Sequence, residues 1–213
     1  MTLRQDILDY LNTEIIPQYT GFDKAHDINH VSKVIKSSLA LAEELGADTE
    51  IAYVVAAYHD IGLANGRENH EKASAVYLLA DKQLQLWFAQ DVIDMMAEAV
   101  EDHRASTDHE PRSIYGKIVA EADRDIDYQT ILKRILLYSL EHYPEYTATR
   151  HWERCISHLK EKYSESGYIK LWLDIGPNRR NLTEMQAIMR DENRVREDFM
   201  RLYRGHSQLN IHT

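Results

Sequence analysis

The eight residues from Ile51 to Tyr58, IAYVVAAY, are apolar almost all the way round a helix, and the polar pair His59 and Asp60 follows them directly. A helix without a polar face is typical of the centre of a protein core. Successive helical positions lie about 100° apart, so His59 and Asp60 reach a common point only if the helix ends or is buried there. Gly62 stands where a helix is expected to stop. This segment therefore predicts a central buried helix that places two polar side chains at one site.

Helical periodicity dominates the rest of the chain. No segment has four or more residues of clean apolar alternation bounded by turns, as a half-buried strand would. The fold class we expect is all-α. The first expected helix runs from a Thr2-x-x-Gln5 capping box to about Tyr19, and the second from near His30 to Leu45, with Gly46 as the stop. A fourth begins near Asn69, an N-cap residue type, and runs to Ala80, and the last begins at Asn181-x-x-Glu184. The other expected helices cover 51–61, 91–104, 113–126, 128–142 and 147–164.

The length and composition favour one domain. The chain has 213 residues, enough for a sizeable core, and its eight glycines and four prolines form no stretch that resembles a flexible linker. We therefore expect a single unit, with a core over about 22–127 and C-terminal helices over about 128–205 packed on it.

The formal net charge of −10 would repel a polyanion, so we expect no nucleic-acid partner. No apolar run approaches the roughly 18 residues that span a bilayer, and the N-terminus lacks a basic region followed by an apolar one, so neither membrane association nor export is expected. A single cysteine, Cys155, agrees with a reducing cytoplasm, and its helical spacing with Trp152 and Leu159 predicts a core position.

Several polar residues fall on the buried faces of the expected helices. His103 continues the apolar stripe that includes Met96 and Ala99, Asp123 lies four residues after Val119, and His30 lies four before Val34. An isolated buried charge costs several kcal/mol on typical estimates, so a buried carboxylate must be paired or bound to a metal. Convergence of such residues from separate helices predicts one shared polar centre.

Imidazole and carboxylate groups around one point suit zinc, manganese, iron or nickel better than calcium or magnesium. We interpret His30, His59, Asp60 and Asp123 as the ligand set of one divalent transition metal. A lone buried histidine is more often hydrogen-bonded in a core, and this interpretation stays open for His26, His142, His151 and His158.

These residues, in this order, resemble the HD superfamily of metal-dependent phosphohydrolases. The matching segments, over about residues 22–127, are AHDINHVSKVI, AAYHDIGL, NHEKASAVYL, AVEDHRAS and IYGKIVAEADRDID. The order His, His-Asp, His, His, Asp is a specific signature, and these segments are similar to those of small stand-alone bacterial HD hydrolases. The resemblance implies an HD-type helical bundle with a helical C-terminal extension.

The resemblance also assigns roles within the site. It implies that the first metal is held by His30, His59, Asp60 and Asp123, and that His70 and His103 are ligands of a second metal bridged by Asp60. One ion is expected and a second is permitted. The chain lacks the signatures of three better-known branches: the adjacent histidines and Gly-Tyr-Pro of cyclic-di-GMP phosphodiesterases, the acidic pair of alarmone hydrolases, and the histidine-rich stretch of deoxynucleoside triphosphate triphosphohydrolases.

The expected chemistry is attack of metal-activated water on a small anionic phosphate ester, a nucleotide or a related phosphomonoester or phosphodiester. Asp60 would orient or deprotonate the water, and His26 is a candidate partner of His30 or proton donor to the leaving group. Basic residues near the ligands are candidates for holding the phosphate; they are Arg67, Lys72, Arg104 and Arg124.

Two alternatives remain open. Some HD-fold proteins are di-iron oxygenases, and a helical module could also keep a metal for stability without turnover. The acidic surface and the long amphipathic last helix permit a homodimer without requiring one.

Overall fold

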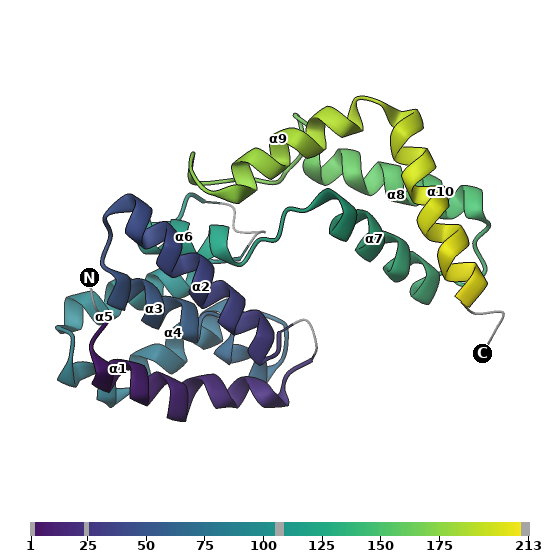
Figure 1. The fold of residues 1–213 in the computed structure, drawn as a ribbon. Helices are drawn as coiled ribbons and strands as arrows, with labels where there is room; N and C mark the ends of the chain where they lie inside the picture. The colour runs from purple at the N-terminus through teal and green to yellow at the C-terminus, as the bar shows by residue number, and fades with distance from the viewer. Residues whose placement is uncertain (1–2, 24–25, 105–108, 210–213) are drawn as a thin grey trace. The chain divides into compact units, whose positions relative to one another are not determined.

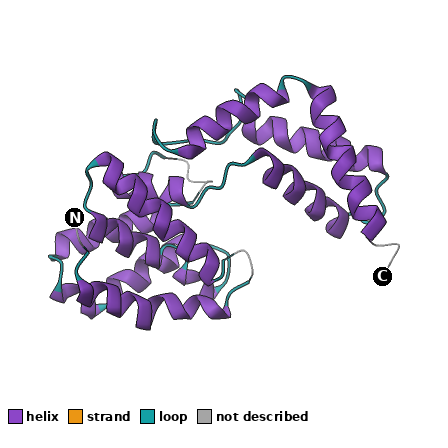
Figure 2. Cartoon of the chain, in the orientation of Figure 1, coloured by secondary structure: helices purple, strands orange, loops and turns teal. Residues whose placement is uncertain are grey.

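The structure, a computed structural model, describes residues 3–23, 26–104 and 109–209, and for 207–209 the backbone alone. In these ranges the chain forms ten α-helices and four shorter helical segments, and no strand (Figure 2). The expected all-α fold class is confirmed.

The chain divides into two compact units. Unit 1 comprises residues 1–124 together with 172–174, and unit 2 comprises 125–171 and 175–213. The boundary lies close to residue 127, where the expected core ends. Packing of the two parts into a single domain stays a prediction.

Unit 1 is built around one buried helix, α3 (Thr49–Tyr58). All residues from Ala52 to Tyr58 are buried, as the apolar sequence predicts. Helix α3 contacts α2 (Ile28–Leu45), α4 (His70–Ala80), α5 (Gln90–Glu101) and α6 (Ile114–Ala122), so its C-terminal end reaches the centre of the unit (Figure 1). Burial of the α3 side chains from water is the main force that holds this unit together.

The N-terminal helical segment differs from the prediction at its start. Helix α1 covers Gln5–Tyr10, and a π-helical turn (Leu11–Ile15) and a 3₁₀ segment (Ile16–Gly21) continue it. Arg4, not Thr2, occupies the N-cap position; its backbone N–H donates to Glu50 Oε1 at 2.8 Å. The predicted capping box depended on Thr2, which lies outside the described residues. An ion pair between Arg4 and Glu50 on α3 fixes the segment instead.

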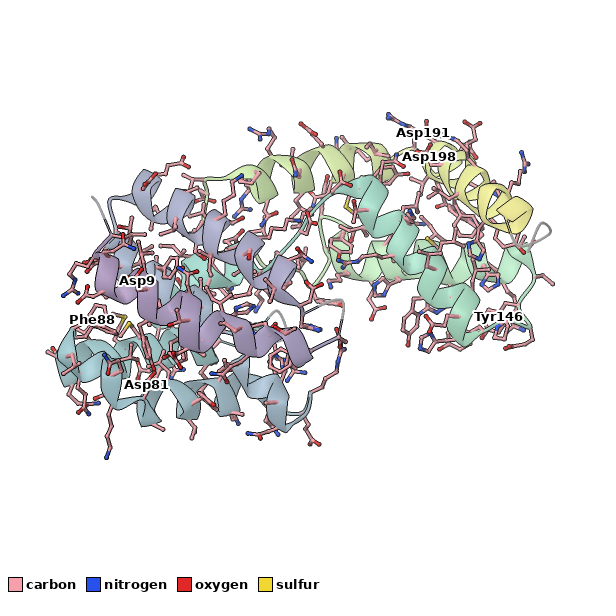
Figure 3. The ribbon with its side chains drawn as sticks, turned by 60° about the horizontal axis from the view of Figure 1, so that its bottom comes forward. Asp9, Asp81, Phe88, Tyr146, Asp191 and Asp198 are labelled. Atoms are coloured by element: carbon pink, nitrogen blue, oxygen red, sulfur yellow. The ribbon has the colours of Figure 1, made fainter. Side chains whose placement is uncertain are left out.

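Three further helix boundaries follow local chemistry. Asp27 caps α2 by accepting from the backbone N–H of Asn29 and His30, and Gly46 ends α2 in the left-handed conformation. Two 3₁₀ segments, Ile61–Asn65 and Lys82–Leu86, flank α4. The side chain of Asp81 accepts from Gln83 N at the start of the second of these (Figure 3).

Unit 2 is formed by α7 (Tyr128–His142), α8 (Ala148–Tyr163), α9 (Pro177–Met189) and α10 (Glu192–Leu209). Its own apolar core includes Leu132, Leu159, Met185 and Phe199. Cys155 is fully buried in that core, as predicted.

The prediction of one last helix starting at Asn181 is wrong. Helix α9 starts at Pro177, which suits the first helical position because proline has no N–H to leave unpaired. The chain then breaks at Asp191, whose carboxylate accepts from Arg194 N at 3.1 Å at the start of α10 (Figure 3). Amphipathic spacing continues across the break, which is why periodicity alone did not detect it.

No helix in the part of the chain that the structure describes combines the length and apolar character needed to span a bilayer.

Candidate metal centre

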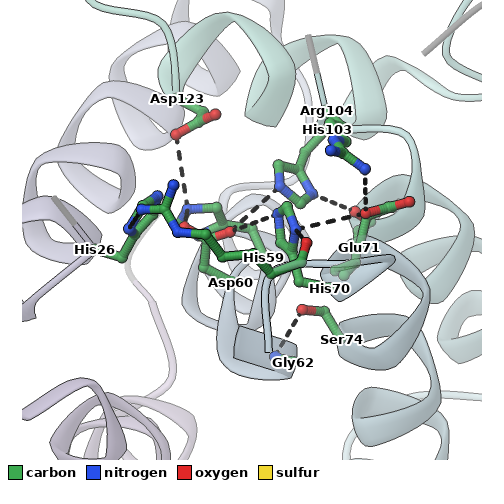
Figure 4. Close-up of polar contacts among 12 residues, drawn as sticks. His26, His59, Asp60, Gly62, His70, Glu71, Ser74, His103, Arg104 and Asp123 are labelled. Atoms are coloured by element: carbon green, nitrogen blue, oxygen red, sulfur yellow. Dashed lines mark hydrogen bonds and ion pairs between the residues drawn. The ribbon is translucent and has the colours of Figure 1, made fainter. Parts of the chain in front are cut away.

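All predicted metal ligands lie at the ends of helices in unit 1 (Figure 4). His30 and His70 lie in the first turns of α2 and α4. The others come at or just after C-terminal ends: His59 and Asp60 after α3, His103 after α5 and Asp123 after α6. The C-terminal end of a helix carries partial negative charge, which favours a cation there. The predicted helices that included His103 and Asp123 end earlier, at Glu101 and Ala122.

The first group joins four side chains around one point. His30 Nε2 lies 3.2 Å from His59 Nε2, 3.5 Å from Asp60 Oδ2 and 3.2 Å from Asp123 Oδ1. His59 Nε2 lies 3.3 Å from Asp60 Oδ2 and 3.9 Å from Asp123 Oδ1. The structure thus brings together the whole predicted primary set.

The protonation of His59 provides a test of whether this group suits a cation. His59 Nδ1 lies 2.8 Å from the backbone oxygen of Ala56, so Nδ1–H donates and Nε2 carries a lone pair. That lone pair faces His30 Nε2 and two carboxylates, which themselves only accept when ionised. Such a convergence favours a positive charge among these atoms, and a divalent metal would supply one in place of the proton on His30 Nε2. The donor set therefore fits a transition metal.

The second group forms on the other oxygen of Asp60. Asp60 Oδ1 lies 3.2 Å from His70 Nε2 and 3.4 Å from His103 Nε2. His70 Nδ1 donates to the backbone oxygen of Arg67 at 3.0 Å, and His103 Nδ1 to that of Val100 at 2.6 Å. Both rings therefore turn Nε2 toward Asp60, which is the orientation that metal-binding histidines commonly have.

Asp60 thus lies between two candidate ion positions, with Oδ2 toward His30 and His59 and Oδ1 toward His70 and His103. Its side chain is almost completely buried. The geometry agrees with a bridging carboxylate in a two-metal site.

The electrostatics match this arrangement. Burial favours the neutral form of Asp60, yet the electrostatic interaction with His59 and the hydrogen bonds from His103 and His30 hold its pKa well below the usual range. Burial would raise the pKa of Asp123, but the hydrogen bond from His30 and the electrostatic interactions with His59 and His103 together lower it. Burial alone would lower the pKa of His30, but the contacts with Asp123 and Asp60 raise it to about 9. The two carboxylates are therefore ionised and attract positive charge.

Gly62 permits α4 to approach the site closely. A Cβ atom at this position would lie 2.3 Å from His70 O and 2.4 Å from Ser74 N, closer than any side chain tolerates. Instead, Gly62 N donates to Ser74 Oγ at 2.9 Å. Helix α3 stops before Gly62, at Tyr58, so the role of this glycine is close packing and not the termination we expected.

Of the predicted phosphate-binding residues, Arg104 is joined to the ligand His70 through Glu71. Its Nη1 lies 3.3 Å from Glu71 Oε2, and the same oxygen lies 3.6 Å from His70 Nδ1 (Figure 4). Glu71 is buried, and the sequence interpretation missed it, although its place directly after His70 in the first turn of α4 was a usable signal.

Arg67 and His26 meet at the surface. Arg67 Nη2 lies 2.9 Å from Asp23 Oδ2, and His26 Nδ1 lies 2.9 Å from Asp23 Oδ1. His26 precedes the first residue of α2, and its ring lies edge to face with that of His30, with centroids 5.7 Å apart.

The other two candidates are less well placed. Lys72 is exposed on α4. The side chain of Arg124 is buried beside Glu121, with Nη1 3.7 Å from Oε1. Burial lowers the pKa of Arg124, opposed by the charges of Glu121 and Asp123. Binding of phosphate by either residue stays a prediction.

Comparison with known proteins places the site in a family. Residues 27–126 match the family model of the HD domain. A predicted HD superfamily hydrolase from an uncultured Thermotogales bacterium is 23% identical, with a TM-score of 0.47, over 72% of this chain and 83% of its own. Bacillus subtilis YpgQ, solved in complex with ADP, is 16% identical with a TM-score of 0.51, over 97% of this chain and 95% of its own. No curated protein matches the chain with statistical significance.

Residues 27–126 therefore form an HD domain, and the resemblance noted in the sequence is confirmed for this segment. All six predicted metal ligands fall inside the matched segment, whereas His26 lies one residue before it.

Proposed function

We propose that the protein is a metal-dependent hydrolase of a small phosphate ester. The observation that carries this proposal is the Asp60 carboxylate, whose two oxygens face two separate groups of histidine nitrogens. A divalent transition metal bound there, such as manganese, iron, zinc or nickel, would activate a water molecule and polarise a phosphoryl oxygen.

The residues of the chain have distinct parts in this proposal. Asp60 orients or deprotonates the attacking water, and the other ligands keep the carboxylate in place. Arg104, 43% exposed at the side chain and paired with Glu71, is the best placed guanidinium to hold a phosphate oxygen. His26 lies next to His30 and is 24% exposed, so it is accessible to a leaving group that needs a proton.

The substrate class follows from charge and from the structural relative. A surface with formal charge −10 disfavours polyanions but permits a small anion at a cationic centre. Bacillus subtilis YpgQ was solved with ADP bound. We therefore propose a nucleotide or a related phosphate ester as substrate, with no nucleic-acid polymer, no membrane and a cytoplasmic setting. A homodimer also stays a prediction.

A panel assay tests the proposal. Purified protein is incubated with phosphomonoesters, nucleotides and cyclic dinucleotides in the presence of added manganese, nickel, zinc or iron. We expect phosphate release from one class, lost in Asp60→Ala and kept in Asp94→Ala, which removes an exposed carboxylate on α5. Activity that survives in Asp60→Ala would contradict the assigned role.

The same two-group geometry also favours a second candidate, a di-iron oxygenase. Two irons per chain together with oxygen consumption would select it over the hydrolase. A third reading, a metal-stabilised module without activity, predicts metal-dependent melting and no turnover on any phosphate ester.

A further inference from the structure

Tyr19 contacts both His59 and Asp60, although it comes from a segment about forty residues earlier in the chain. Its side chain is completely buried. The hydroxyl donates to the backbone oxygen of Ala57 at 2.9 Å and accepts from Asp60 N at 3.2 Å. Its ring lies roughly parallel to that of His59, with centroids 6.3 Å apart.

These contacts satisfy two backbone groups at the end of α3. The last carbonyl groups of a helix have no partner within the helix, and a buried one without a hydrogen bond costs about 1–3 kcal/mol. The Tyr19 hydroxyl donates to one such carbonyl, that of Ala57. It also accepts from the backbone N–H of Asp60, three residues further along the chain.

Asp60 needs this support because its backbone leaves the helix there. Its φ and ψ are −114° and 5°, outside the helical region, and this turn directs its carboxylate between the two histidine groups. We propose that Tyr19 is a positioning residue of the metal centre: its hydroxyl fixes the backbone of Asp60 so that both carboxylate oxygens face their histidines. The proposal rests on the metal centre proposed above.

Tyr19→Phe tests this role, because it removes one oxygen and keeps the ring. The matched control is Tyr115→Phe. The Tyr115 hydroxyl accepts from Asp48 N at 3.1 Å, at the opposite end of the same helix α3, so this variant also loses a hydroxyl-to-backbone bond without touching the ligands.

The measurements are the dissociation constant for Mn²⁺, the visible spectrum of the Co²⁺-loaded chain and the urea midpoint, with circular dichroism as the check on folding. We expect Tyr19→Phe to bind Mn²⁺ at least about tenfold more weakly and to change the Co²⁺ bands, as loss of a supporting contact commonly does. Tyr115→Phe should lower the urea midpoint and leave both metal readouts unchanged.

Equal metal affinity in Tyr19→Phe and the wild type would overturn the role of Tyr19, and so would equal weakening in both variants. Failure of the hydrolase proposal is distinguishable, since the assay measures metal binding and not turnover. A wild-type chain that binds no metal would overturn the metal centre and the role of Tyr19 together.

A second, independent feature lies in unit 2, where α7 and α8 border a cavity of about 380 Å³. Three of its five lining residues carry basic groups: Arg134 on α7, and Arg154 and His158 on α8. Within the described ranges, neither arginine forms an ion pair with a carboxylate. The guanidinium of Arg154 lies over the rings of Tyr138 and Tyr143, at 4.9 and 5.2 Å from their centroids.

Two consequences follow for this cavity. Contact with two rings restricts the motion of Arg154, so less conformational entropy is lost when it binds an anion. Among the described residues, the two arginines form no ion pair with a carboxylate, so their charge attracts anions. Such a cationic site is unusual in a chain with formal charge −10. Burial lowers the pKa of His158. The charge of Glu161, on the next turn of α8, raises that pKa, but Glu161 does not line the cavity.

We infer that this cavity binds a small phosphate-bearing anion. The probes are inorganic pyrophosphate and ADP, added to the full-length chain with a chelator present, and the readout is the NMR signal of the His158 ring. We expect a shift of this signal that saturates with added anion, and an affinity about tenfold weaker in Arg134→Ala and in Arg154→Ala. Tighter binding of ADP than of pyrophosphate would identify a nucleotide as the source, and equal binding the free anion.

Arg150→Ala is the matched control. Arg150 lies on the same helix over the ring of Tyr146, 5.1 Å from its centroid, but does not line the cavity. Absence of any shift at His158 would overturn the inference. Equal weakening in Arg150→Ala would also overturn it, because binding would then follow overall charge.

Discussion

Each oxygen of the Asp60 carboxylate faces a different pair of histidines, so this single residue links the two halves of the metal centre. His59, the residue before it, contributes to one half only. The adjacent positions therefore differ in how many ions they affect, although the sequence presents them as one pair.

This difference predicts distinct metal counts. Asp60→Asn should weaken binding at both positions, because an amide offers one neutral oxygen in place of two charged ones. His70→Ala should remove only the second ion. Elemental analysis of the purified variants measures the number of ions per chain. If Asp60→Asn retains the wild-type number, the bridging assignment is wrong.

Cys155 illustrates burial without function. Burial raises the pKa of its thiol to about 12, because the apolar core disfavours the thiolate. At pH 8, about one molecule in 10⁴ would carry the reactive thiolate. We expect negligible alkylation by iodoacetamide in the native state and complete alkylation in urea, read by mass spectrometry. Rapid labelling of the folded chain would contradict this.

At the scale of elements, the site depends on how closely α4 packs behind the His59-Asp60 turn. Gly62 lies against the first turns of α4, so the position of His70 is set by a backbone contact and not by side-chain packing.

Gly62→Ala should therefore move α4 and separate His70 from Asp60. Overpacking of a tight contact typically costs about 1–3 kcal/mol, and here the added atom meets backbone. We expect a lower urea midpoint and loss of the second metal before the first. Gly21→Ala is the control, since a Cβ there meets nothing within 4 Å. Equal behaviour of the two variants would refute the packing argument.

The end of α5 is fixed by an ion pair next to His103, between the buried carboxylate of Asp102 and the partly exposed side chain of Arg112. Asp102 Oδ2 accepts from the backbone N–H of Arg112 at 2.7 Å, and Oδ1 lies 2.7 Å from Arg112 Nη2. Burial would raise the pKa of Asp102, but the hydrogen bonds from Arg112 lower it below its ordinary value.

A lowered carboxyl pKa means that the folded state binds the proton less tightly than the unfolded state. The contribution of Asp102 is therefore present above the unfolded pKa of about 3.9 and is lost as pH falls through the folded value. The stability difference between wild type and Asp102→Asn, measured by urea unfolding from pH 7 to pH 3, should shrink toward the acid end. A constant difference would contradict the assignment.

At the scale of the molecule, all six predicted ligands lie in unit 1, and unit 2 has an apolar core of its own. A metal that binds only the folded state stabilises it by mass action, about 2.7 kcal/mol at a concentration 100 times the dissociation constant.

Chelation should consequently act on unit 1. We expect faster amide hydrogen exchange in α3, α4, α5 and α6 after treatment with a chelator, and recovery after Mn²⁺ is restored. The amides of α7 and α8 provide the comparison within the same sample. Unchanged exchange in unit 1 would show that no stabilising metal was bound.

The sequence by itself determined the helical fold class and the buried helix that ends at Tyr58, because helical periodicity shows which side chains face inward. It also predicted the six residues that the structure brings together at the end of that helix, in part through the resemblance to the HD family. It could not determine where α5 and α6 end, since capping and packing decide the last turn. The division of the last helical stretch at Asp191 was also missed, because the amphipathic pattern continues across the break.

Only the tertiary structure decided which oxygen of Asp60 faces which histidines, that Glu71 pairs with Arg104, and that Tyr19 supports the turn at Asp60. Apart from the contacts of Asp60 with His59 and His70, these contacts join residues of separate segments, 33 positions apart for Arg104 and Glu71 and 41 for Tyr19 and Asp60. Local patterns indicate which face of a helix is buried, but not which residues of another helix meet it there, because that depends on how the helices pack.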